Sequence, residues 1–60
     1  MTWSVVQQRW DGVKWAYVDH VWHTFFKRRA ERRARELGKA YRARWQPGME
    51  RYRYRIEKSS

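Results

Sequence analysis

The predicted fold depends on residues 13–37, which read VKWAYVDHVWHTFFKRRAERRAREL and contain neither proline nor glycine. Apolar residues recur through this stretch at helical spacing. They form two neighbouring stripes, one made of Val6, Trp10, Val13, Tyr17 and Val21 and the other of Trp15, Val18, Trp22 and Phe25. Together the stripes are wider than the roughly 100° that a surface helix needs. We therefore expect an aromatic helix that is covered on more than one side. Asp11 and Gly12 are a candidate start, and Trp3 and Val6, which are in phase, could extend the helix backwards.

The helical pattern continues as a basic segment over residues 27–45. Its apolar positions keep to one narrow side and are Ala30, Ala34, Leu37, Tyr41 and Trp45. The opposite side is basic and carries Arg28, Arg32, Arg35, Lys39 and Arg42. Gly38 is a place where two helical pieces could bend apart, and the sequence QPGME predicts a turn over residues 46–50.

Residues 51–58 change period, because RYRYRIEK alternates bases with apolar residues as far as Ile56. This alternation is typical of a strand with one buried face. A single strand is not stable by itself, so we expect it to pair with the sheet edge of a partner protein. The predicted fold class is mainly α: a helix or helical hairpin followed by a short C-terminal strand that pairs with a partner sheet. Residues 1–60 are predicted to form one small domain. It consists of an aromatic helical segment (1–26), a basic helical segment (27–45), a turn (46–50) and a strand (51–58).

Positive charge is concentrated in the second half of the chain. The 60 residues include fifteen Lys and Arg, eleven of them Arg, against six Asp and Glu, which gives a net charge of +9. Residues 1–26 hold two bases and two acids, whereas residues 27–60 hold thirteen bases and four acids. This excess indicates an acidic partner, either nucleic acid or protein carboxylates.

The small size and the lack of cysteine predict dependence on a partner. A chain this short buries only about 60% of the surface that its unfolded form exposes. Because it has no cysteine, disulfides and thiolate metal sites cannot compensate. We expect another chain or RNA to supply the missing stabilisation, so that the protein is not a stable monomer. No apolar run approaches the ~20 residues that span a bilayer, so no membrane span is predicted.

The sequence favours a protein that is not an enzyme. No serine or threonine lies near both a histidine and an acid, as a catalytic nucleophile requires. The three glycines are isolated, which excludes a glycine-rich phosphate loop. Asp19, His20 and His23 could share one side of a helix, but no further ligand completes a metal site. We interpret the histidines as solvated or interface residues and predict neither a metal nor a cofactor.

Two groups of residues are candidate contact sites. The predicted partner interface is rich in Trp and Tyr, which combine apolar area with a polar tip; its members are Trp10, Tyr17, Val21, Trp22, Tyr52, Tyr54 and Ile56. The predicted basic contacts are Arg28, Arg29, Arg32, Arg33 and Arg35, which would meet RNA phosphates, protein carboxylates or solvent. For the aromatic residues, packing against protein competes with stacking on single-stranded bases.

The chain resembles the epsilon subunit family of the mitochondrial ATP synthase. The residues that carry the resemblance are Trp10 and Tyr17 in WDGVKWAY and the alternating tail RYRYRIEK. Where that family usually has an Ala and Gly pair, this chain has Val13 and Lys14. The resemblance implies a non-catalytic subunit of the central stalk that packs against the delta and gamma subunits. It also implies a place in the mitochondrial matrix, in a complex at the inner membrane.

Two other functions remain open from the sequence. A small basic ribosomal protein would place on rRNA phosphates the residues Arg28, Arg29, Arg32, Arg33, Arg35, Arg42 and Arg44. A supernumerary subunit of a respiratory complex would rest Trp and Arg residues at the membrane surface. Salt separates these functions, because rRNA binding weakens steeply as ionic strength rises and an aromatic protein interface does not.

Overall fold

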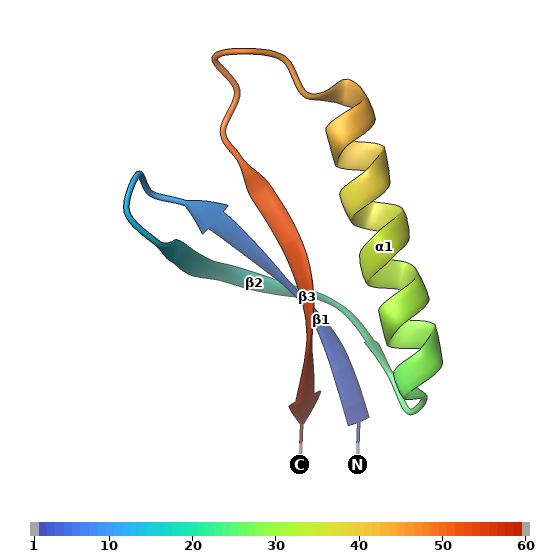
Figure 1. The fold of residues 1–60 in the computed structure, drawn as a ribbon. Coiled ribbons are helices and arrows are strands. Elements are labelled where there is room, and N and C mark those ends of the chain that lie inside the picture. Colours follow the sequence, from blue (N-terminus) through green and yellow to red (C-terminus); the bar gives the residue numbers. More distant parts are fainter. Residues whose placement is uncertain (1, 60) are drawn as a thin grey trace.

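The computed structural model describes residues 2–59, which form three strands and one helix. The elements are β1 (Thr2–Trp10), β2 (Trp15–Thr24), α1 (Lys27–Arg44) and β3 (Tyr52–Ser59) (Figure 1). The strands form one antiparallel sheet in the order β2-β1-β3, so β1 is central and both other strands are edges. The predicted mainly α fold was therefore wrong, because most of the regular structure is sheet.

Residues 1–26 were predicted to be an aromatic helix, but their described part forms the β1–β2 hairpin. Asp11 and Gly12 form the hairpin turn instead of starting a helix. The Asp11 carboxylate accepts the backbone N–H groups of Val13 and Lys14, both at 2.8 Å. Gly12 has a φ of 99°, a conformation that residues with a side chain rarely adopt. An Asp-Gly pair between two strands is a strong hairpin signal, and here it overrides the helical spacing.

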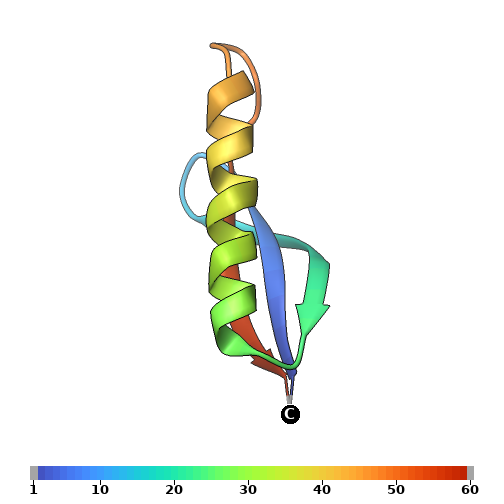
Figure 2. The same cartoon turned by 90° about the vertical axis from the view of Figure 1, so that its right-hand side faces the viewer.

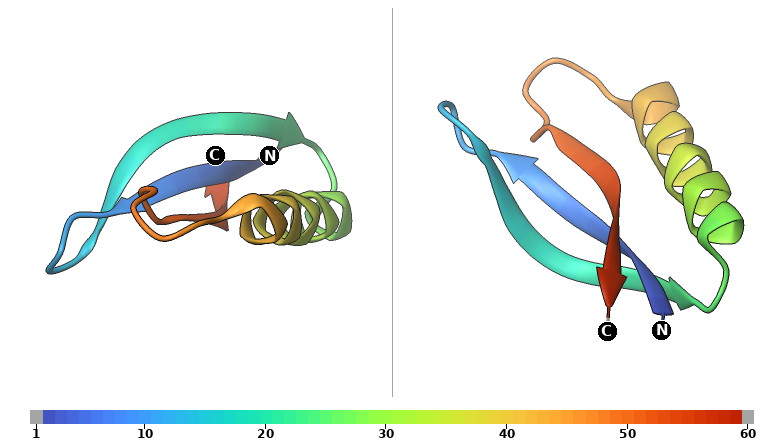
Figure 3. Two further views of the ribbon diagram at one scale, coloured as in Figure 1. Left: turned by 90° about the horizontal axis from the view of Figure 1, so that it is seen from above. Right: turned by 60° about the horizontal axis from the view of Figure 1, so that its bottom comes forward.

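Strand β2 curves strongly along its length (Figure 3). The register against β1 shifts twice, and the residues left without a partner are Val18 and Val21. Each shift is a bulge, which bends a strand and increases its local twist. Both bulge residues are exposed.

The core lies between the sheet and α1, which packs against one face (Figure 2). Val5 of β1 is fully buried and meets Ala30 and Ala34 of the helix. These two alanines are one helical turn apart, and their small side chains let α1 approach the sheet closely. Around this centre pack the half-buried side chains of Trp3, Trp22, Leu37, Tyr54 and Ile56.

The basic segment is helical where helix was predicted, and its predicted apolar side faces the sheet. The helix runs without interruption through Gly38. The alternative of a helical hairpin is therefore wrong.

Strand β3 pairs with β1 of the same chain, so the pairing predicted with a partner sheet is made within the protein. The register runs from Thr2 opposite Ser59 to Arg9 opposite Tyr52. The strand needs no outside neighbour, which removes one reason for expecting an unstable monomer. Tyr17, one of the residues that carry the resemblance to the ATP synthase subunit, lies in β2.

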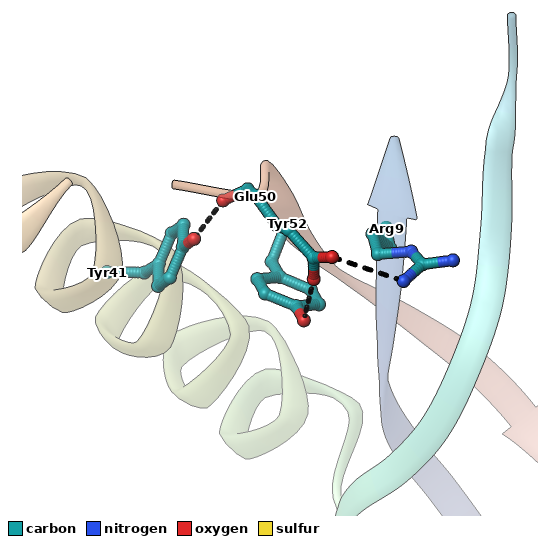
Figure 4. A network of polar contacts seen from close by, with 4 residues as sticks. All are labelled: Arg9, Tyr41, Glu50 and Tyr52. Atoms are coloured by element: carbon teal, nitrogen blue, oxygen red, sulfur yellow. Dashed lines mark hydrogen bonds and ion pairs between the residues drawn. The ribbon is translucent and has the colours of Figure 1, made fainter. Parts of the chain in front are cut away.

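A polar network around Glu50 fastens the turn before β3 to the rest of the fold (Figure 4). The Tyr52 hydroxyl donates to the Glu50 carboxylate at 2.6 Å, and Arg9 Nη1 donates to the same carboxylate at 3.3 Å. The Tyr41 hydroxyl donates to the backbone carbonyl oxygen of Glu50. The rings of Tyr41 and Tyr52 meet edge to face, with centroids 5.3 Å apart. The network ties β1, α1 and β3 together at one end.

Candidate nucleic-acid interface

A trough follows the seam between α1 and β3, which lie side by side in Figure 1. It consists of three adjoining hollows of about 310, 320 and 310 Å³. Neighbouring hollows share lining residues: Arg35 and Arg55 at one junction, Arg42 and Tyr52 at the other. We call this surface the trough throughout.

The charge of the trough is strongly positive. Its charged residues are one acid, Glu31, and five bases, Arg35, Arg42, Arg51, Arg53 and Arg55. Within residues 2–59 the ion pairs are Arg9 with Glu50, Arg33 with Glu36 and His20 with Glu57, so none involves a trough arginine. Within residues 2–59, no carboxylate therefore neutralises any of the five guanidinium groups by an ion pair.

Two structural features bring these arginines together. Arg35 and Arg42 are seven residues apart on α1, which is about two helical turns and places them on one side of the helix. Arg53 and Arg55 are two residues apart on β3 and share one side of that strand. Arg53 is crowded: partial desolvation and, next, the charge of Arg55 lower the pKa of its guanidinium from the ordinary value. It still carries its charge at neutral pH, and a bound anion would relieve the repulsion.

Aromatic rings line the end of the trough nearest the turn, and they are Trp15, Tyr41, Trp45 and Tyr52. The Arg51 guanidinium lies 5.8 Å from the Trp45 ring centroid, and that of Arg53 lies 4.5 Å from the Trp15 centroid. The buried indole N–H of Trp45 has no acceptor within the described part of the chain. The trough thus combines cations with flat rings, and both groups can contact nucleotides.

The predicted basic contacts are all exposed on α1, but they do not form one surface. Arg35 lines the trough. On another side of the helix, a hollow of about 370 Å³ is lined by Trp22, Arg29, Arg32, Arg33 and Glu36. Arg33 is paired there with Glu36, whose carboxylate lies 3.4 Å from Nη1. Arg28 lines neither surface.

The predicted partner interface is divided by the fold. Trp22, Tyr54 and Ile56 pack against the protein's own core. Tyr52 is half-buried and belongs to the Glu50 network. Three other members, Trp10, Tyr17 and Val21, are 38%, 59% and 40% exposed.

The two histidines lie side by side on β2, with parallel rings whose centroids are 5.9 Å apart. His20 Nδ1 shares a 2.8 Å hydrogen bond with the Tyr17 hydroxyl, and His23 Nδ1 shares one of 2.8 Å with Ser4 Oγ. The Asp19 carboxylate accepts the backbone N–H of His20. Among residues 2–59 no three His, Cys, Asp or Glu side chains are arranged to hold a metal ion.

Sequence reasoning missed most of the trough. The alternation in residues 51–58 predicts that Arg51, Arg53 and Arg55 lie on the strand side opposite the apolar residues, but it does not predict that they line a surface next to α1. These arginines reach the trough because β3 pairs with β1. The alternating tail was the sequence signal for this pairing, had it been matched with a second strand in the same chain.

Comparisons of the chain with protein-family models, with curated proteins and with solved structures found no match. Within residues 2–59 there is no helix with both the length and the apolar character needed to cross a lipid bilayer.

Proposed function

We propose that this protein binds nucleic acid and that the trough holds the phosphate backbone. The observation that carries the proposal is the gathering of five arginines in one trough, with no ion pair to a carboxylate within residues 2–59. A guanidinium group is a planar fork that matches two phosphate oxygens. Five such groups in water repel one another, and phosphates would reverse that repulsion.

The aromatic residues at the same place favour nucleic acid over an acidic protein surface. Carboxylates need only the cations, whereas nucleotides use both charge and flat rings. Tyr41, Trp45 and Tyr52 supply those rings beside Arg42 and Arg51. The role of a stalk subunit packed against other protein chains, with its mitochondrial location, stays a prediction.

Binding to a fluorescently labelled RNA tests the proposal. We expect the logarithm of the association constant to fall linearly with the logarithm of salt concentration between about 50 and 200 mM. Each trough arginine that contacts a phosphate adds close to one unit of slope. The double change Arg35→Gln with Arg42→Gln should therefore lower the slope by about two and weaken binding at least about tenfold.

The matched control is Arg28→Gln with Arg44→Gln, which removes the same charge from exposed positions of α1 outside the trough. Its slope should stay close to that of the unchanged protein. Equal losses in the two double variants would mean that net charge, not the trough, governs binding. If the unchanged protein bound no RNA at low salt, the proposed function would be wrong.

A further inference from the structure

The sheet has a second face, turned away from α1, and the strand register identifies its residues. Val5 points to the helix, and side chains alternate along β1, so Gln8 and Trp10 belong to the opposite face. Residues directly opposite in an antiparallel sheet share a face. Gln8 lies opposite Tyr17 on one side and Arg53 on the other.

Two aromatic rings on this face are open to solvent. Trp10 is 38% exposed and Tyr17 is 59% exposed. Trp15 lies opposite Trp10 in the register, and their rings meet edge to face with centroids 5.4 Å apart. We call Trp10, Trp15 and Tyr17 the aromatic face. An exposed group of aromatic residues on a small protein indicates a binding surface.

Arg53 joins the aromatic face to the trough. Its guanidinium lies over the Trp15 ring, and its Nε–H donates to Gln8 Oε1 at 2.6 Å. The same residue lines the trough. A nucleic-acid backbone held in the trough therefore passes next to the aromatic face. Because Arg53 already covers Trp15, the rings left for a ligand are Trp10 and Tyr17.

We infer that the aromatic face stacks unpaired bases, so that the ligand is single-stranded nucleic acid whose backbone follows the trough. The inference rests on the proposed function. In a duplex each base is stacked on its neighbours and has no free face, whereas in a single strand every base offers one. The positive charges of Arg53, which lies over Trp15, and of Arg55 in the adjoining trough complement the phosphates between those bases.

Parallel titrations test the inference with labelled oligouridine and with the same strand annealed to oligoadenosine. We expect Trp10→Ala to weaken binding of the single strand by about 5- to 150-fold, the range for losing one stacked base. Tyr17→Ala should act in the same direction and is a second variant if Trp10→Ala is misfolded by circular dichroism. Neither change should alter the affinity for the duplex.

Two controls isolate stacking from other effects. Tyr17→Phe keeps the ring and loses the hydrogen bond to His20, so binding of the single strand should be retained. Phe25→Ala removes an aromatic ring that is 73% exposed and lies between β2 and α1, away from the aromatic face, and should have no effect.

The outcomes separate this inference from the proposed function. If both alanine variants bound oligouridine as tightly as the unchanged protein while the Arg35 and Arg42 changes still weakened binding, stacking would be excluded and the trough would stand. Equal weakening for single strand and duplex would also overturn the inference. If oligouridine and duplex both failed to bind the unchanged protein, the proposed function and the inference would fall together.

Discussion

The two halves of the chain differ in charge and in aromatic content, yet both contribute strands to one sheet. Residues 1–26 hold two bases, two acids and seven of the eleven aromatic residues, and their described part forms the β1–β2 hairpin. Residues 27–60 hold thirteen bases and four acids, and they supply α1 and β3. The central strand comes from the neutral half and an edge strand from the basic half. This arrangement keeps the arginines beside the core instead of within it.

The comparison shows that a central strand and an edge strand differ in how regularly polar and apolar residues alternate along them. Ser4, Val5 and Val6 are consecutive and all buried, and they lie in the central strand, which has a neighbouring strand on each side. Alternation is therefore lost in β1. The edge strand β3 has an open side, and its arginines alternate with half-buried apolar residues over Tyr52–Ile56. An alternating pattern thus identifies an edge strand more readily than a central one.

The largest loss of stability is expected from a charge placed in the core, where side chains of the two halves pack together. Val5 is 0% exposed and contacts both Ala30 and Ile56. Val5→Asp buries a carboxylate without a partner, and we expect it to lower the free energy of unfolding by about 4 kcal/mol or more. That loss is comparable to the whole stability of a domain this small. Urea denaturation followed by circular dichroism measures it.

Val13→Asp is the matched control, because Val13 is 84% exposed in the hairpin turn. It should change the free energy of unfolding by no more than about 0.5 kcal/mol. A cooperative transition in Val5→Asp near that of the unchanged protein would show that the hairpin and the helix do not share one core.

A smaller effect should come from two glycines in turns, one in each half: Gly12 between β1 and β2, and Gly48 between α1 and β3. Gly12 and Gly48 have φ values of 99° and 98°. A Cβ atom at either position meets no atom within 4 Å, so the penalty for alanine is backbone strain alone. We expect Gly12→Ala and Gly48→Ala each to lower the free energy of unfolding by about 1–3 kcal/mol.

Replacing Gly38 by alanine should change the free energy of unfolding in the opposite direction. Gly38 lies within α1, has no positive φ, and its added Cβ would also meet nothing within 4 Å. Gly38→Ala should raise the free energy of unfolding by roughly 0.5–1 kcal/mol. Thermal melting of the three variants would contradict this account if Gly12→Ala or Gly48→Ala were as stable as Gly38→Ala.

How far the sequence predicts this fold differs between its halves. The helix at Lys27–Arg44 and the strand that follows it could be predicted, because local spacing and a Pro-Gly turn define them. The hairpin could not be predicted from period, because β2 carries Trp and Val on both sides and imitates a wide helical stripe. Asp11 and Gly12 were the decisive residues, and they were interpreted as a helix start.

The candidate site was predicted only in part. Arg35 was expected to contact an acidic partner and does line the trough, but Arg42 and the three arginines of residues 51–55 join it through tertiary structure. No local sequence pattern predicts that β3 lies beside α1. The aromatic face likewise depends on the pairing of Trp10 with Trp15, which a helical interpretation separates.

The smallest expected effects concern how the free energy of unfolding depends on pH, and each half of the chain contributes one titrating group. In the hairpin, the backbone N–H groups of Lys14 and Val13 hold the pKa of Asp11 below its ordinary value of 3.8. In the second half, the hydrogen bond to the Glu50 carboxylate raises the pKa of Tyr52 above its ordinary value of 10.0. The two groups therefore titrate at opposite ends of the pH scale.

The signs of the two contributions follow from linkage. The unfolded chain takes up a proton at Asp11 more readily than the folded chain, so this stabilisation is present above the ordinary pKa and is lost as pH falls through the lower, folded value. Folded Tyr52 keeps its proton more tightly than the unfolded chain does. Its stabilisation is therefore present below the ordinary pKa and is lost as pH rises through the higher, folded value.

Urea denaturation across pH checks both contributions with one variant for each half. Asp11→Asn keeps an acceptor in the hairpin turn but removes the titration, so its free energy of unfolding should fall less steeply in acid than that of the unchanged protein. Tyr52→Phe keeps the ring against Tyr41 but removes the hydroxyl, so it should lose the alkaline component and leave the acid limb unchanged. If Asp11→Asn altered the alkaline limb, or Tyr52→Phe the acid one, the two turns would not act independently. The neutral half would then be coupled to the basic half through Arg9, which reaches Glu50 from β1.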